Sequence, residues 1–104
     1  MTFNDFMIIG KDIKNSSDII KKLNNKKPVL NCFLVADNKG TLEIYPAAKF
    51  VQPDLNALDI DIVAIFKNKK EAFEFIRVLA DISIKKFGKP DLIKALPFYE
   101  EEVM

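Results

Sequence analysis

A β-rich apolar segment, followed by a segment in which apolar and polar residues alternate, predicts a β-hairpin. The segments are residues 28–36 (PVLNCFLVA) and 41–45 (TLEIY), and the turn sequence DNKG separates them. Gly40 can take the positive φ angle that a tight hairpin turn requires. Because the first segment is apolar on both faces, we expect it in the centre of the sheet, while Pro46 ends the second segment.

Further strands are predicted on either side of this hairpin. Residues 59–66 (DIDIVAIF) form a third strand with one shared face, made of Ile60, Ile62, Ala64 and Phe66. Residues 3–9 (FNDFMII) fit either a short strand that is closed by Gly10 or a helical turn. The connection between the second and third strands, residues 46–58, has room for one helical turn at 47–51.

The first helix is predicted at residues 17–25, where apolar side chains recur at helical spacing: Ile19, Ile20 and Leu23. Ser16 or Ser17 is expected to cap its N-terminus, and Pro28 prevents the helix from continuing. The lysines of this region then lie on the far side of the helix or near its C-terminus, where cations favour the helix dipole.

The longest helix is predicted at residues 69–87. Asn68 and Glu71 form a capping pair at its start, and Gly88 suits the position after its last turn. Its apolar stripe consists of Phe73, Ile76, Ala80 and Ile84, and the stripe is widened by Phe75, Leu79 and Ile82. This is more apolar surface than one sheet face requires, so the helix should also pack against the first helix, the C-terminal segment or a second subunit.

These elements predict a single α+β domain that spans residues 1–104. We expect a three- or four-stranded, mostly antiparallel sheet with two or three helices packed on one face, in the order (β)-α-β-β-β-α-(α). The last helix in this order is short, starts at Asp91 and stops at Pro97, and the terminal EEEVM is expected to fray.

The composition excludes several classes of catalytic and metal-binding site. Histidine, the commonest general base and metal ligand, is absent. Cys32 is the only cysteine, which excludes an internal disulfide and a multi-cysteine zinc site, and we expect it to be a buried structural residue. The three glycines are isolated, so no phosphate-binding glycine loop is formed. We therefore expect no catalytic residues and no cofactor.

The start of the chain gives no indication of export. Its first residues, MTFNDFMIIGKD, lack the basic start and the long apolar run of a secretory signal, and no window has the roughly 18 apolar residues of a membrane span. Together with the single cysteine, this favours an intracellular, cytoplasmic protein.

Two groups of lysines make backbone binding to RNA or DNA the first alternative function. They are Lys21, Lys22, Lys26 and Lys27 near the first helix, and Lys69 and Lys70 at the start of the main helix. Cations in a first helical turn oppose the helix dipole but would suit a bound phosphate. The same lysines also fit an ordinary solvated surface, because the net charge is only +1 at pH 7. Arg77 is the only arginine, which argues against sequence-specific DNA recognition.

A pair of carboxylates gives the second alternative function, a metal-dependent enzyme. Asp59 and Asp61 alternate with isoleucines, so both point to one face at the start of the third strand. Paired carboxylates can hold Mg²⁺ or share a proton. The same pair also fits a solvated strand start.

The leading interpretation is a small non-catalytic interaction or accessory protein. It would act through a protein partner or through a second copy of itself. Four aromatic residues could form an exposed patch for such an interface: Tyr45, Phe50, Phe98 and Tyr99.

Overall fold

The computed structural model describes residues 1–51 and 59–103; part of the predicted connection, residues 52–58, lies outside the described residues, as does Met104. Four strands form one sheet in the order β1-β4-β2-β3. They are β1 (Thr2–Ile9), β2 (Phe33–Asn38), β3 (Thr41–Pro46) and β4 (Asp61–Phe66). β2 is antiparallel to β3 and to β4, while β1 is parallel to β4. The predicted α+β class and the mostly antiparallel sheet are confirmed.

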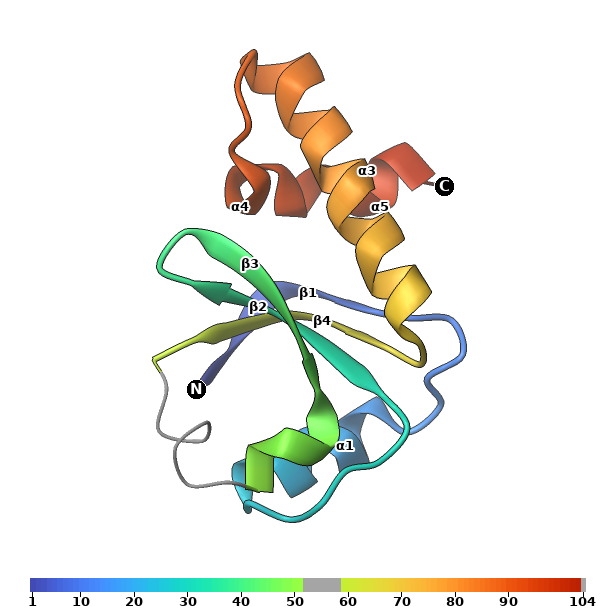
Figure 1. Cartoon of the computed structure of the whole chain (residues 1–104). Helices are drawn as coiled ribbons and strands as arrows, with labels where there is room; N and C mark the ends of the chain where they lie inside the picture. Colours follow the sequence, from blue (N-terminus) through green and yellow to red (C-terminus); the bar gives the residue numbers. More distant parts are fainter. Residues whose placement is uncertain (52–58, 104) are drawn as a thin grey trace.

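Helices cover both faces of the sheet (Figure 1). One face carries α3 (Lys69–Phe87), α4 (Leu92–Ala95), the 3-10 turn η2 (Leu96–Phe98) and α5 (Tyr99–Val103). The opposite face carries α1 (Ser16–Asn24) and the 3-10 turn η1 (Ala47–Val51). α3, α4 and α5 thus share one face, but the expectation that all helices pack on one face is wrong, because α1 lies on the other. No helix in residues 1–51 and 59–103 is both long enough and apolar enough to cross a membrane.

The two faces of the sheet bury two separate clusters of apolar side chains. The cluster under α3 includes Ile8, Val35, Val63, Ala64, Phe66, Phe75, Leu79, Ile82 and Leu96. The cluster under α1 includes Leu23, Val29, Cys32, Leu34, Ala36, Phe50, Ile60, Ile62 and Ile65. β2 and β4 contribute to both clusters, which explains why their sequences are apolar on both faces.

A β-bulge in β4 corrects the predicted face of that strand. Val35 of β2 pairs with Ala64, but the next residue, Ala36, pairs with Ile62, so Val63 is an extra residue in β4. The extra residue shifts the alternation of side chains by one position. Consequently Ile62 faces α1 while Ala64 faces α3. The prediction that Ile60, Ile62, Ala64 and Phe66 share one face is therefore wrong.

The hairpin turn has the predicted geometry. Lys39 and Gly40 both have positive φ angles, 55° and 94°, as in the tight two-residue turns that match the twist of a hairpin. Asp37 Oδ1 accepts a hydrogen bond from the Gly40 N–H at 2.8 Å. β2 begins only at Phe33, because the chain before it is irregular and Asn31 has a φ of 62°.

We expect that replacing Gly40 with valine lowers the free energy of unfolding by about 1–3 kcal/mol. A Cβ atom at position 40 would meet no heavy atom within 4 Å, so the cost comes from the backbone and not from a clash. A β-branched side chain tolerates a positive φ angle poorly. Urea denaturation of the variant measures this cost, and an unchanged midpoint would contradict the turn assignment.

The ends of the helices follow the sequence in part. Asn68 Oδ1 accepts a hydrogen bond from the Glu71 N–H at 2.8 Å, and Gly88 has a φ of 71° after the last turn of α3. Both predicted caps of α3 are thus confirmed. The expected serine cap of α1 is wrong: Asn15 occupies the N-cap position, and its side chain makes no capping bond.

The C-terminal segment continues further than predicted. Pro97 does not end the helical structure. It lies at the start of η2, where backbone N–H groups have no partner within the helix, so a proline there costs no hydrogen bond. The chain then forms α5, so most of the expected frayed end is helical.

Candidate interaction surface

α3 carries two neighbouring stripes of apolar side chains, and only one of them is buried. The buried stripe contains Phe75, Leu79 and Ile82, which face the sheet. The second stripe contains Phe73, Ile76, Ala80 and Ile84, in which Phe73 is 58% exposed and Ile84 is 52% exposed. The sequence placed both stripes in one broad apolar surface that should be covered, and within the described structure Phe73 and Ile84 are not covered.

The elements around α3 explain why the second stripe stays open. η2 lies against β1, and the C-terminal segment adds partly buried apolar residues to the core under α3. α3 itself lies over β4 and β2 and reaches β3. α1 cannot cover the stripe, since it packs on the opposite face of the sheet (Figure 1). The first helix and the C-terminal segment, two of the elements expected to cover α3, therefore leave Phe73 and Ile84 exposed.

The open stripe continues onto the edge strand β3. Leu42 and Ile44 point to the α3 side of the sheet and are only partly buried. With Phe73, Ile76, Lys69 and Glu43 they line a shallow hollow between β3 and α3. We call the six apolar residues of this region the α3–β3 surface; they are Leu42, Ile44, Phe73, Ile76, Ala80 and Ile84. The sequence does not reveal the position of this surface, because the same spacing of apolar residues also fits a buried stripe.

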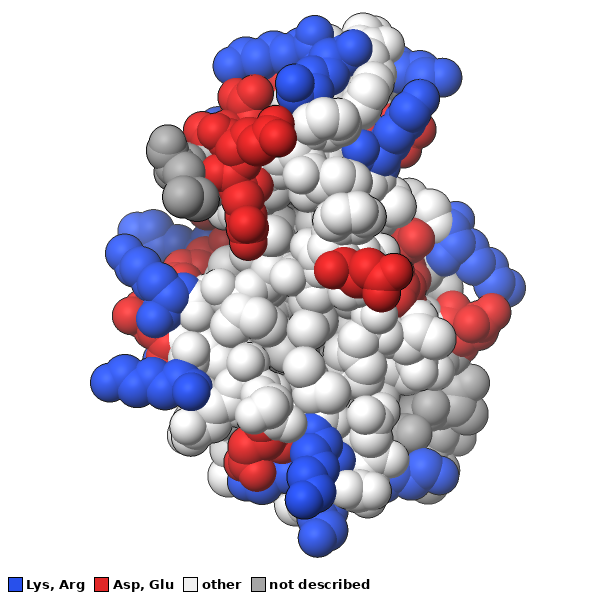
Figure 2. Space-filling model, turned by 180° about the vertical axis from the view of Figure 1, so that it is seen from behind, with Lys and Arg blue, Asp and Glu red and all other residues white. Residues whose placement is uncertain are grey.

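An area without charged side chains lies at the opposite edge of the sheet (Figure 2). Figure 1 shows the sheet from its β3 edge, so Figure 2 looks onto the β1 edge, where a broad area without charged side chains is bordered by lysines and carboxylates. Among the residues of β1 and α1, Phe3, Met7 and Ile19 are partly buried against the core under α1. Phe6 of β1 is 56% exposed, so the β1 edge also carries an exposed apolar side chain.

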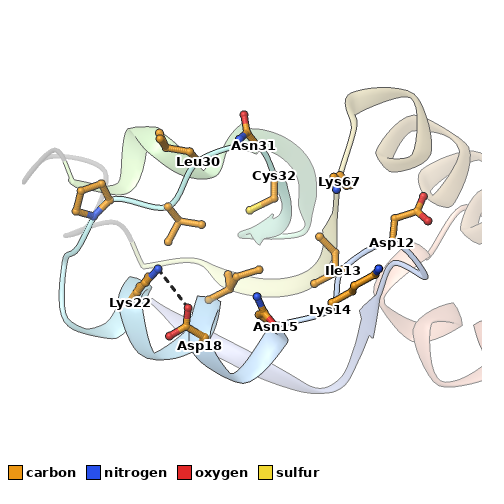
Figure 3. A pocket seen from close by; sticks show the side chains of 13 residues that line it. Asp12, Ile13, Lys14, Asn15, Asp18, Lys22, Leu30, Asn31, Cys32 and Lys67 are labelled. Atoms are coloured by element: carbon orange, nitrogen blue, oxygen red, sulfur yellow. Dashed lines mark ion pairs between the residues drawn. The ribbon is translucent and has the colours of Figure 1, made fainter.

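A polar cleft of about 530 Å³ lies between α1 and the segment that leads into β2 (Figure 3). Asp18 and Lys22 of α1 and the N-cap residue Asn15 line one wall, and Lys22 forms an ion pair with Asp18 at 3.2 Å. Cys32 lines the cleft from the opposite side, and Lys67 lies at one end. The cleft is built from mixed charges that partly neutralise one another.

The thiol in this cleft is a weak candidate for a nucleophile. Cys32 is buried, and burial raises the pKa of its thiol, which keeps it protonated at neutral pH. The chain contains no histidine that could act as its base. Cys32 is therefore best described as a small apolar residue of the core under α1.

A third hollow lies beside the ends of β1 and β4. Its walls include the aromatic rings of Phe66, Phe75 and Tyr99, which contact one another, and carboxylates such as Glu71 and Glu74. Burial raises the pKa of the Tyr99 hydroxyl, and the charges of Glu74 and Glu71 raise it further. Both carboxylates already have partners, since Glu71 accepts from Asn68 and Glu74 pairs with Arg77. The carboxylates of Glu71 and Glu74 are therefore already engaged in interactions within the chain.

The two lysine groups lie on elements that pack against opposite faces of the sheet. Lys21 and Lys22 belong to α1, and Lys26 and Lys27 follow it, whereas Lys69 and Lys70 open α3 (Figure 1). Lys69 places its Nζ atom over the Phe73 ring, 5.8 Å from the centroid. The structure thus does not gather the six lysines into one basic surface.

We expect that replacing both Lys69 and Lys70 with alanine leaves the protein without measurable RNA affinity at about 10 μM, and stabilises it by a few tenths of a kcal/mol at low salt. Two cations then leave the positive end of the α3 dipole, and the lost contact of Lys69 with Phe73 offsets part of the gain. Fluorescence anisotropy and thermal denaturation measure the two effects. Wild-type RNA binding that weakens in the variant, with a flatter salt dependence, would instead support phosphate contacts.

The four aromatic residues predicted as an interface do not form one patch. Tyr45 contacts Phe50 on the α1 side of the sheet, with ring centroids 5.4 Å apart, and Phe50 is buried. Phe98 and Tyr99 lie on the α3 side, where their rings contact Phe87 and Phe75 respectively.

The two carboxylates of the predicted metal site have different surroundings. Asp61 is bound to β1, because its two oxygens accept hydrogen bonds from Thr2 Oγ1 at 2.7 Å and from Asn4 Nδ2 at 2.8 Å. Asp59 is exposed. Within residues 1–51 and 59–103, no three acidic or cysteine side chains lie together as metal ligands would. Asp61 instead has a structural role at the junction of β1 and β4.

Comparison with known proteins adds no relative to this picture. No protein-family model, no curated protein and no solved structure shows a significant match to this chain.

Proposed function

We propose that this protein is a small, non-catalytic interaction module that binds a protein partner, or a second copy of itself, through the α3–β3 surface. The observation that carries the proposal is the exposure of Phe73 and Ile84 on a helix whose other apolar stripe is already buried. Large apolar side chains that remain exposed in one continuous surface are typical of protein interfaces.

The arrangement of this surface also supports the proposal. An apolar stripe on a helix and an adjacent edge strand present two of the features by which proteins bind other chains, namely a helix face and free strand backbone. Phe73 is an aromatic residue at the point where the stripe on α3 meets β3, and aromatic residues often contribute much of the binding energy of an interface. The polar cleft beside α1 is a weaker candidate, because burial raises the pKa of its thiol and Asp18 is already paired with Lys22.

Photocross-linking in the cells that express the protein tests the proposal. A benzophenone side chain replaces Phe73 in one variant and Leu30 in a matched control, because Leu30 is also a large apolar residue and is 68% exposed. We expect a discrete covalent adduct from position 73 that is absent from position 30. Mass spectrometry of the adduct then identifies either a second copy of this chain or another protein.

The outcome that would contradict the proposal is equally clear. If position 73 gives no adduct, or gives the same diffuse pattern as position 30, the α3–β3 surface is not an interface under those conditions. A benzophenone at Ile84, at the far end of the same stripe, should give the same adduct as position 73 if the whole stripe is covered by one partner.

A further inference from the structure

The hollow beside the ends of β1 and β4 has an apolar floor. The side chains of Ile8, Phe66 and Phe75 line it from the core, and Tyr99 is partly exposed at its surface. Its volume of about 890 Å³ lies within the range of cavities that hold small organic ligands. The hollow can therefore take up the apolar part of a small molecule.

Charged side chains of one sign dominate the rim of this hollow. Four carboxylates line it together with a single cation; they are Asp12, Glu71, Glu74 and Glu100, and the cation is Lys11. A concave site with this balance of charge attracts cations and repels anions.

Most of these carboxylates keep their negative charge without a cationic partner. Glu74 is the only one of the four that forms an ion pair within the described part of the chain. Glu71 accepts a hydrogen bond at 2.8 Å from the side-chain amide of Asn68, which is neutral and leaves the charge in place. Asp12 and Glu100 are exposed. The negative charge of the rim is therefore available to a ligand.

The hydroxyl of Tyr99 responds to this charge. Burial raises the pKa of the hydroxyl, and the charges of Glu74 and Glu71 raise it further. A negative potential opposes the formation of an anion and, for the same reason, stabilises a cation at the same place. The carboxylates therefore act on the interior of the hollow and not only on the solvent around it.

We propose that this hollow binds a small organic amine, protonated at neutral pH, whose ammonium group pairs with Glu71 and Glu100 and whose apolar group packs on Tyr99. A primary amine fits better than a quaternary ammonium ion, because its N–H groups can donate to carboxylates. The ring of Tyr99 adds an attraction for a cation above its face. The site is separate from the α3–β3 surface, since Phe75 faces the core while Phe73 is exposed, and it does not depend on the proposed function.

Nuclear magnetic resonance titration of the ¹⁵N-labelled chain tests the proposal with four probes. 2-Phenylethylamine and hexylamine carry an ammonium group on an apolar body, while 2-phenylethanol and 1-hexanol carry the same bodies without a charge. We expect the amines to bind with dissociation constants of about 1 mM, and the alcohols to bind at least about fivefold more weakly. The amide signals of Gly10, Lys11, Glu71 and Tyr99 should shift most.

Removing the charges of Glu71 and Glu100 tests their role directly. In the double variant Glu71→Gln, Glu100→Gln, the glutamine at position 71 can still accept the capping bond from Asn68, so the fold should be kept. We expect the affinity for 2-phenylethylamine to fall about fivefold. The matched control is Glu101→Gln with Glu102→Gln, which removes the same charge from α5 at positions outside the hollow and should change the affinity less than about twofold.

Several outcomes would overturn the proposal. If no signal shifts at amine concentrations up to about 10 mM, the hollow does not take up amines. Equal affinities for amines and alcohols would mean that only the apolar floor contributes, and equal losses in the two double variants would mean that the charges act from a distance. Shifts that are largest around Phe73 and Ile44 would place the amine on the α3–β3 surface instead.

Discussion

Replacing Phe75 with alanine should lower the free energy of unfolding by about 3–5 kcal/mol, the range for large aromatic residues in protein cores. Phe75 is 1% exposed and lies between the rings of Phe66 and Tyr99, at centroid distances of 5.3 and 4.9 Å. Its removal leaves a cavity where α3, β4 and α5 meet. Urea denaturation, monitored by circular dichroism, gives the change in stability.

Phe73→Ala is the matched control, because it removes the same atoms from the same helix two residues away. Phe73 is more than half exposed, so we expect a loss of less than about 1 kcal/mol, as for other surface substitutions. The comparison is made at low protein concentration, so that association through the α3–β3 surface does not contribute. Equal losses in the two variants would mean that both stripes of α3 are buried, and would remove the basis of the proposed function.

Replacing Leu23 with alanine should cost about 2–5 kcal/mol, although α1 is a short helix with an uncapped N-terminus. Leu23 is 1% exposed and belongs to the core between α1 and the sheet. Short helices derive most of their stability from such tertiary packing. The substitution therefore tests whether α1 is anchored on the face of the sheet opposite to α3.

The control for Leu23→Ala is Leu30→Ala, which truncates an exposed leucine in the segment after α1. We expect its effect to stay within about 0.5 kcal/mol. If Leu23→Ala were equally mild, α1 would not be part of the folded core, and the two-faced architecture would be wrong. Thermal and urea denaturation should agree on the order of the two variants.

Much of the fold could be predicted because it depends on local properties of the chain. The positive φ angle at Gly40, the capping bond from Asn68 and the left-handed Gly88 each involve neighbouring residues only. The alternation in β3 and the length of α3 follow from periodicity in the same way. These features need no knowledge of what lies on the other side of the sheet.

The candidate site was harder to predict, because exposure is not a property of a local pattern. Phe73 and Phe75 have similar neighbours in the sequence, yet one is exposed and the other is buried. The breadth of the apolar surface on α3 did indicate that something beyond one sheet face should cover it. Which stripe would remain open depended on where α1 and the C-terminal segment packed.

The sequence by itself determined the β2–β3 hairpin, the strand β4, the helix α3 with its caps, the α+β class and the absence of histidine, because these depend on residue types and their spacing. Only the tertiary structure decided which residues face which neighbour. The bulge at Val63 reverses the alternation within β4, and the position of α1 opposite to α3 leaves the stripe from Phe73 to Ile84 open. Both depend on contacts between segments far apart in the chain, and a one-residue shift in strand pairing is enough to exchange the two faces of a strand.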